Sequence, residues 1–156
     1  KEEEKIYKKS DLQFRYRFSS FNKNEIITNI KFQCKKGNPN DIKNLRFKSS
    51  IKRKKAQPLN FKSAGSIFKN PKNGPAAGFL IDNVGLKGLR IGGAEISQKH
   101  ANFIVNHGNA IASDVLELIK IIKKEVYEKY KILLELEIKL VGFNKLIIRE
   151  LKNEKN

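Results

Sequence analysis

Residues 64–109 read AGSIFKNPKNGPAAGFLIDNVGLKGLRIGGAEISQKHANFIVNHGN, and the rest of the chain is organised around this stretch. It holds eight of the ten glycines, from Gly65 to Gly108, and both histidines. Glycine lets a backbone approach a ligand closely or turn with a positive φ, at an entropic cost. The glycine spacing fits equally well a binding surface or a set of tight turns between short elements.

Length and composition describe one ordinary domain, or a small domain with a piece of another. The 156 residues are 39% hydrophobic, which is enough for a core, and no segment has the ~18 uninterrupted apolar residues of a membrane span. The opening residues KEEEK lack the apolar segment of a secretory signal, and the single Cys34 cannot form an internal disulfide. We therefore expect a cytoplasmic protein with Cys34 buried in a strand.

The net charge of +17 raises the question of an anionic partner. Clusters such as Lys52-Arg53-Lys54-Lys55 are typical of proteins that bind nucleic acid or another acidic partner. The basic residues are not interleaved with the aromatic residues on which single-stranded nucleic acid stacks. We therefore favour the interpretation that the high positive charge reflects a general bias toward lysine in an ordinary enzyme. A non-catalytic basic binding module for nucleic acid or an acidic partner is the alternative.

Helical patterns predict three helices, over residues 39–55, 75–84 and 114–130. The first begins at a proline and carries a weak apolar stripe formed by Ile42, Leu45 and Ile51. The third is predicted to be capped by Ser113 or Asp114, because an acidic residue follows Asp114 at capping-box spacing.

Alternation of apolar and polar residues predicts the strands. The clearest is 25–34, where Ile26, Thr28, Ile30, Phe32 and Cys34 share one face. Further extended segments are predicted over 12–21, 89–91, 94–96, 103–105 and 134–141. Residues 1–10 are predicted to be a charged, poorly ordered end, and 143–156 a terminal strand with a charged tail.

Several kinds of site do not fit the sequence. One cysteine and two histidines cannot close a zinc site. The glycine-rich stretch lacks the Gly-Lys-Ser/Thr ending of a phosphate-binding loop, and Ser66 does not stand in a Gly-x-Ser-x-Gly elbow.

Three motifs carry a resemblance to a known family: GSIFKNP at 65–71, GLKGLRIGGA at 85–94 and HANFIVN at 100–106. In this order they closely resemble the substrate-binding domain of UDP-N-acetylenolpyruvoylglucosamine reductase, also called UDP-N-acetylmuramate dehydrogenase. The resemblance runs from about Phe14 to about Gly142. It implies an α+β chain: the tail of a flavin-binding domain followed by a small substrate-binding domain with antiparallel strands and two to three helices.

The resemblance also implies a division of the chain. Residues 1–56 would be the C-terminal part of an FAD-binding domain whose N-terminal part is absent. Residues 57–142 would be the substrate-binding domain, and 143–156 the terminal strand and tail. The expected partner is the missing N-terminal flavin-binding half, with no membrane and no nucleic acid.

The activity implied by the resemblance is the NADPH- and FAD-dependent reduction of UDP-N-acetylglucosamine enolpyruvate to UDP-N-acetylmuramate, in peptidoglycan precursor synthesis. The family is an oxidoreductase acting on a CH–CH group, with roles in cell-wall biogenesis, cell shape and cell division. Matched residue by residue, the catalytic positions are Arg17, Ser66 as proton donor, and Glu137. The substrate-binding positions are Tyr16, Lys69 and Asn70. No cofactor-binding residue is assigned, and no metal is expected.

Without the family, each of these residues has a plainer interpretation. Arg17 would be a cation on a strand surface, Ser66 a turn residue and Glu137 a solvent-facing strand residue, while Lys69 and Asn70 would be loop residues. His100 is interpreted as structural.

Three positions depart from the family pattern. Arg15 replaces a glycine and Phe18 an aspartate around Arg17. Ala56 stands where the family often has a lysine near the substrate phosphate, a place that Lys55 would fill only by shifting one position.

Overall fold

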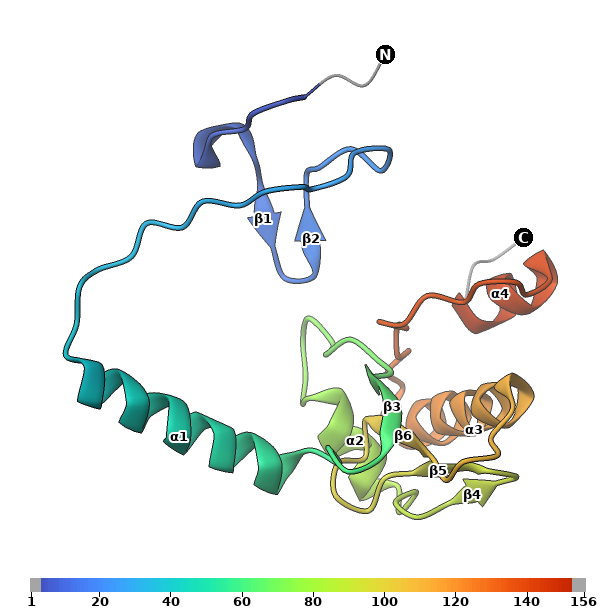
Figure 1. The fold of residues 1–156 in the computed structure, drawn as a ribbon. Helices are drawn as coiled ribbons and strands as arrows, with labels where there is room; N and C mark the ends of the chain where they lie inside the picture. Colours follow the sequence, from blue (N-terminus) through green and yellow to red (C-terminus); the bar gives the residue numbers. More distant parts are fainter. Residues whose placement is uncertain (1–3, 153–156) are drawn as a thin grey trace. The chain divides into compact units, whose positions relative to one another are not determined.

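The computed structural model describes residues 4–152 and divides the chain into two compact units, Lys1–Asn38 and Pro39–Asn156 (Figure 1). The division falls earlier than the predicted boundary at residue 57, because the helix that begins at Pro39 is grouped with the second unit. The domain boundaries at 57 and 143 stay predictions. The elements are mixed helices and antiparallel strands, so the predicted α+β class is confirmed.

The first unit contains a short hairpin. A 3-10 helix, η1 (Lys9–Asp11), precedes β1 (Phe14–Arg15) and β2 (Phe18–Ser19), which pair antiparallel around a two-residue turn. The ring of Phe21 meets those of Tyr7 and Phe14 edge to face, with centroids 5.9 and 6.1 Å away. The extended segment predicted over 12–21 is therefore a hairpin.

The strand predicted over 25–34 is not formed, and that prediction is wrong. No strand within residues 4–152 pairs with this segment. Ile26 is 88% exposed and Phe32 is 79% exposed. Cys34 is exposed as well, contrary to the expected buried thiol. Alternation of apolar residues produces a strand only where a neighbouring strand supplies hydrogen bonds and a packing surface, and the described residues supply neither.

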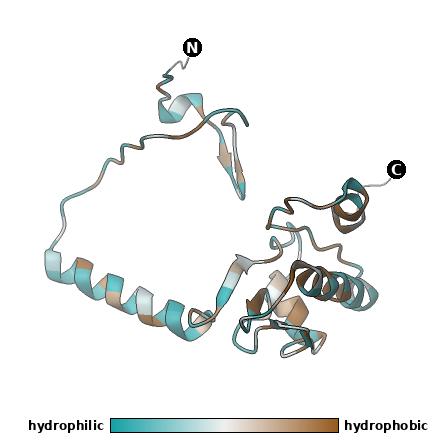
Figure 2. Cartoon of the chain, turned by 45° about the vertical axis from the view of Figure 1, so that its right-hand side comes forward, coloured by the Kyte–Doolittle hydropathy of each residue, from teal (hydrophilic) through white to brown (hydrophobic). Residues whose placement is uncertain are grey.

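The predicted basic helix is confirmed as α1 (Pro39–Ala56), and all its residues are exposed. Successive residues turn by about 100°, so Leu45 and Phe47 lie about 200° apart around the axis. Ile42 lies near Leu45, and Ile51 near Phe47. The predicted single stripe is thus two apolar stripes on opposite sides, and Figure 2 shows them as scattered hydrophobic positions on a mainly hydrophilic helix.

The second unit is built on a four-stranded antiparallel sheet. Its strands are β3 (Lys62–Ser66), β4 (Arg90–Ile91), β5 (Ala94–Ile96) and β6 (Phe103–Asn106), in the order β3-β6-β5-β4. The helix α3 (Ala112–Tyr130) packs against β4 and β5, and the short helix α2 (Ala77–Asn83) packs against α3 (Figure 1). The strands predicted over 89–91, 94–96 and 103–105 and the two helices are confirmed.

The core of this unit lies between the sheet and the helices. Ile96 and Ile104 pair across β5 and β6 and are buried together with apolar residues of both helices. Those helical residues are Ala77, Leu80, Ile81, Leu118, Ile119, Ile122 and Val126. The 3.6-residue spacing of the α3 residues puts them on one face, which is why the sequence pattern located this helix.

The start of α3 corrects the predicted cap. The helix begins one residue after Ile111, and Asp114 lies inside its first turn. The Asp114 carboxylate accepts the backbone N–H of Ile111 and that of Gly93, both at 3.1 Å. Asp114 therefore stabilises the helix start from within and ties it to the turn between β4 and β5.

Two other predictions near the C-terminus are wrong. Residues 134–141 do not form a strand of the sheet. Among the described residues they make one isolated bridge, between Leu136 and Phe68, with backbone bonds to residues 67 and 69 on either side of it. The terminal strand is instead the helix α4 (Lys145–Lys152), which buries Leu151 and packs Ile147 on the core. Apolar residues four apart suit a helix better than a strand. The last residues of the predicted tail, 153–156, lie outside the described residues, as do residues 1–3 of the predicted charged end.

Within the described residues, no helix is both long and apolar enough to cross a bilayer.

Candidate functional site

Ser66 is the last residue of β3, at a point where the strand changes register. Ser63 pairs with Val105 and Ser66 pairs with Phe103, so the intervening residues form a bulge. Gly65 sits in this bulge with φ of +82°, and a Cβ there would meet nothing within 4 Å. Glycine is needed for its backbone conformation rather than for space. The bulge sets the direction in which the chain continues from the sheet after Ser66, which is partly buried.

The three residues after Ser66 are held along both edges. On one side Ile67 N–H donates to the carbonyl of Asn102 at 2.9 Å. On the other, Lys69 N–H donates to the carbonyl of Glu135 and Glu137 N–H to the carbonyl of Ile67, both at 2.8 Å. Glu137 is therefore held opposite the residue that follows Ser66. The fold brings these two predicted catalytic residues onto adjacent segments.

The predicted substrate-binding Lys69 forms an ion pair with Glu135 across the same bridge. The Glu135 side chain is 70% exposed, so the pair is solvated and contributes little to stability. Sequence reasoning missed Glu135, although an acidic residue two positions before Glu137 in an alternating segment was a visible signal.

Asn70 has a structural contact that the sequence did not suggest. Its Oδ1 accepts the backbone N–H of Ala77 at 3.0 Å, at the start of α2. Asn70 thereby closes the loop over 70–77, and its contact with a substrate stays a prediction.

Asn102 is a buried polar residue to which sequence reasoning assigned no role. Its side chain is buried; its Oδ1 accepts Phe68 N–H at 2.9 Å and its Nδ2 donates to the Phe68 carbonyl at 2.8 Å. A buried asparagine in the otherwise apolar HANFIV run was the available signal, since buried polar groups require partners.

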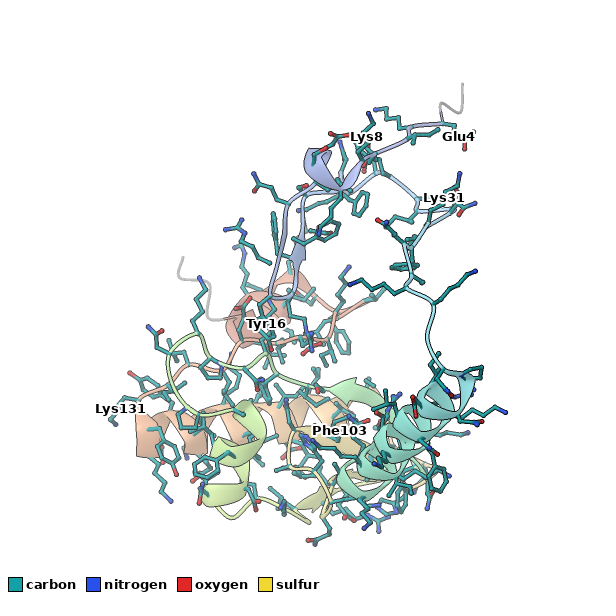
Figure 3. The ribbon with its side chains drawn as sticks, turned by 90° about the vertical axis from the view of Figure 1, so that its left-hand side faces the viewer. Glu4, Lys8, Tyr16, Lys31, Phe103 and Lys131 are labelled. Carbon is teal, nitrogen blue, oxygen red and sulfur yellow. The ribbon has the colours of Figure 1, made fainter. Side chains whose placement is uncertain are left out.

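Tyr16 and Arg17 belong to the first unit and form the turn of its hairpin; Tyr16 is labelled in Figure 3. Arg17 has φ of +53°, which is uncommon outside glycine, and its Cζ lies 5.1 Å from the Tyr16 ring centroid. The two departures from the family pattern, Arg15 and Phe18, are cross-strand partners. Arg15 Cζ lies 4.5 Å from the Phe18 ring centroid, so the two residues make a cation–π contact with one another.

A hollow of about 390 Å³ lies between β3, β6 and the start of α3. Ile67 and Ser63 are among its lining residues, whereas Ser66 and Glu137 are not. The predicted catalytic residues therefore lie beside this hollow and do not line it.

His100 has a structural role, as its sequence context suggested. Its Nδ1 accepts the backbone N–H of Asn102 at 3.2 Å, and its ring lies 4.8 Å from that of Phe103, which Figure 3 labels. Burial lowers the pKa of His100 below its usual 6.5. The neutral ring is thus the form that supports the turn before β6.

This lowered pKa predicts a loss of stability in mild acid. The folded chain binds fewer protons at His100 than the unfolded chain, so its stability contribution is present above pH ~6.5 and falls as pH decreases through the folded pKa. The free energy of unfolding in urea, measured from about pH 7.5 to about pH 5.5, should fall more steeply for wild type than for His100→Asn. An asparagine can accept the same N–H without titrating. Equal slopes for the two proteins would contradict the prediction.

Comparisons with known proteins agree with this architecture. Residues 57–141 match the sequence model of the UDP-N-acetylenolpyruvoylglucosamine reductase C-terminal domain. The chain is 50% identical over 134 residues to the UDP-N-acetylenolpyruvoylglucosamine reductase of Fervidobacterium nodosum, covering 85% of this chain and 43% of that protein. It is 45% identical over 132 residues to that of Clostridioides difficile, covering 84% and 43%.

A solved structure is similar as well. The crystal structure of the UDP-N-acetylenolpyruvylglucosamine reductase from Thermus caldophilus superimposes with a TM-score of 0.73 at 44% identity, covering 85% of this chain and 47% of that one. The chain thus spans less than half the length of these relatives.

Residues 57–141, which contain the four-stranded sheet and the segment after Ser66, match a domain found in reductases. The chain belongs to the UDP-N-acetylenolpyruvoylglucosamine reductase family, within which residues 57–141 form the C-terminal domain. The resemblance found in the sequence is confirmed.

Proposed function

We propose that this chain is part of an enzyme that reduces UDP-N-acetylglucosamine enolpyruvate to UDP-N-acetylmuramate, with FAD and NADPH, in the cytoplasmic synthesis of peptidoglycan precursors. The observation that carries the proposal is the bridge between residues 67–69 and 135–137. It places Ser66, Lys69 and Glu137 on adjoining segments of the matched domain.

The proposed reduction requires a proton donor and groups that stabilise the negative charge beside the substrate carboxylate. When bound, reduced FAD supplies a hydride to one carbon of the enolpyruvyl double bond. The electron pair then collects on the other carbon, beside the substrate carboxylate. Ser66 delivers a proton there, Glu137 acts near the carboxylate, and the guanidinium of Arg17 binds the carboxylate through its fork of donors. Tyr16, Lys69 and Asn70 contact the nucleotide-sugar part.

The cofactors enter this proposal through the family alone. We assign no residue within 4–152 to FAD or NADPH. The strand-like segment 25–34 of the first unit is exposed, with Ile26, Ile30 and Phe32 open to solvent. This exposure fits a fragment of a larger domain better than a complete flavin site. We propose the N-terminal flavin-binding half of the enzyme as its partner.

One observation favours the alternative of a basic binding module. The exposed helix α1 carries seven lysines and arginines against the single Asp41. Such a helix binds polyanions through phosphate contacts, with an affinity that falls steeply with salt.

The two functions are separated by thermal unfolding with each ligand. UDP-N-acetylglucosamine enolpyruvate at a hundredfold excess over its Kd should stabilise the chain by about 2.7 kcal/mol, which raises Tm by roughly 5–10 °C. Mixed-sequence DNA should raise Tm less, and its effect should vanish at high salt. The double variant Lys48→Ala, Lys52→Ala is the control, since it should weaken only the DNA effect. Stabilisation by DNA that equals or exceeds that by the nucleotide sugar at moderate salt would contradict the proposed function.

A further inference from the structure

Residues 67–69 lie between two extended segments that do not otherwise pair. The segment leaves the sheet after Ser66, and its far edge is bonded to residues 135–137. The backbone groups on the opposite edge, which faces Asn102, would then lack partners in β6, because β6 begins only at Phe103. Buried backbone groups of this kind must be paired, at a cost of about 1–3 kcal/mol for each that is not.

Asn102 supplies these partners with its side chain. A carboxamide has the same donor and acceptor as a peptide group, and here both are bonded to one residue, Phe68. The backbone carbonyl of Asn102 binds Ile67 as well. The side chain is only 4% exposed, so water does not compete for these bonds. In effect Asn102 extends the edge of β6 by one peptide unit.

We infer that Asn102 is a positioning residue for the substrate site. Its carboxamide fixes Phe68, which directly precedes Lys69. Its backbone carbonyl fixes Ile67, which directly follows Ser66 and accepts the N–H of Glu137. Asn102 acts through these residues and does not itself contact the substrate. The inference rests on the proposed function.

Asn102→Asp tests this role through pH. A neutral carboxylic acid both donates and accepts, so it reproduces the two bonds to Phe68. The ionised form only accepts, and places a negative charge against the Phe68 carbonyl. Burial raises the pKa of a carboxyl group, so the change of form falls in an accessible pH range. Asparagine and aspartate have nearly the same size, so an effect of side-chain volume alone would not depend on pH.

The experiment measures the Kd of the full chain for UDP-N-acetylglucosamine enolpyruvate, well below each melting midpoint. Relative to wild type at the same pH, Asn102→Asp should weaken binding about tenfold at about pH 8, as expected for roughly 1.4 kcal/mol. At about pH 5.5 it should come within about threefold of wild type, since the neutral carboxylic acid keeps both bonds to Phe68.

Asn106→Asp is the matched control. Asn106 Oδ1 accepts the N–H groups of Gly108 at 2.6 Å and Ala110 at 3.1 Å, and an ionised carboxylate still accepts both. Its affinity should follow wild type at both pH values. Asn102→Asp that behaves like Asn106→Asp at about pH 8, or that binds equally weakly at both pH values, would overturn the inference.

Amide hydrogen exchange provides a second readout in case Asn102→Asp is too unstable for binding measurements at high pH. At about pH 6.5, amide exchange of Lys69 and Glu137 should be faster in Asn102→Asp than in wild type, while that of Gly93 is unchanged. Uniform acceleration of all three amides would mean global destabilisation and would also overturn the inference. A wild-type chain that does not respond to the nucleotide sugar overturns the proposed function instead, and the exchange pattern then still decides whether Asn102 holds this segment.

Discussion

Ser66→Ala, introduced into a complete reductase that contains this chain, should lower the rate of enolpyruvyl reduction by roughly 10²–10⁴-fold, the usual contribution of a general acid. The hydroxyl is the proposed source of the proton that completes the reduction. Stability should hardly change, because the positive φ of the bulge falls on Gly65 and not on Ser66. Ser66→Cys should recover part of the rate, since a thiol can also donate a proton.

Half-reactions locate the defect. Reduction by NADPH, followed by the loss of flavin absorbance, should proceed at the wild-type rate in Ser66→Ala. Reoxidation by the enolpyruvyl substrate should be slow. Turnover within about threefold of wild type would make Ser66 a turn residue, since a general acid contributes far more than that. A melting curve must accompany the kinetics, so that loss of fold is not taken for loss of chemistry.

Gly93→Ala should produce the largest loss of stability among single methyl additions to the glycine-rich stretch. A Cβ at Gly93 would lie 2.3 Å from the backbone N of Ala110 and 2.5 Å from the backbone carbonyl carbon of Asn109. Neither atom can move as a side chain would. The loop before α3 must shift, which strains the bonds from Gly93 N–H to Asp114 and from His107 N–H to the Gly93 carbonyl. Overpacking together with these bonds predicts a cost of about 3–5 kcal/mol.

Gly85→Ala is the matched control for this prediction. Gly85 has φ of +76°, and a Cβ there would meet nothing within 4 Å, so alanine should cost only the left-handed backbone penalty of about 1–2 kcal/mol. Urea unfolding of both variants measures the difference. If Gly93→Ala cost no more than Gly85→Ala, the close approach of the loop to Gly93 would not hold in solution.

Sequence patterns predicted the helices and strands whose periodicity and end residues lie within their own residues. The helices α1, α2 and α3 and the strands β4 to β6 follow from periodicity and from punctuating glycine and proline. Prediction failed where a segment depends on what lies beside it. The alternating segment 25–34 has no partner strand among the described residues, and 134–141 makes one isolated bridge there, from Leu136 to Phe68.

The candidate site divides in the same way. Its family could be predicted from three short motifs, and the resemblance then implied Ser66, Lys69 and Glu137, which stay predictions. The contacts of Asn102, Glu135 and Asp114 could not be predicted, because each joins residues far apart in the sequence. The pairing of Arg15 with Phe18 likewise appears only once the hairpin sets them opposite one another.

The α+β class, the family and the residue types available for the chemistry follow from the amino-acid sequence. Which backbone groups those residues bond depends on the tertiary structure. Propensity and periodicity act over a few neighbouring residues, so they are written into any short stretch. Hydrogen bonds and burial join residues tens of positions apart, and a buried carboxamide finds Phe68, or fails to, only when the sheet, the bulge and the returning segment are all in place.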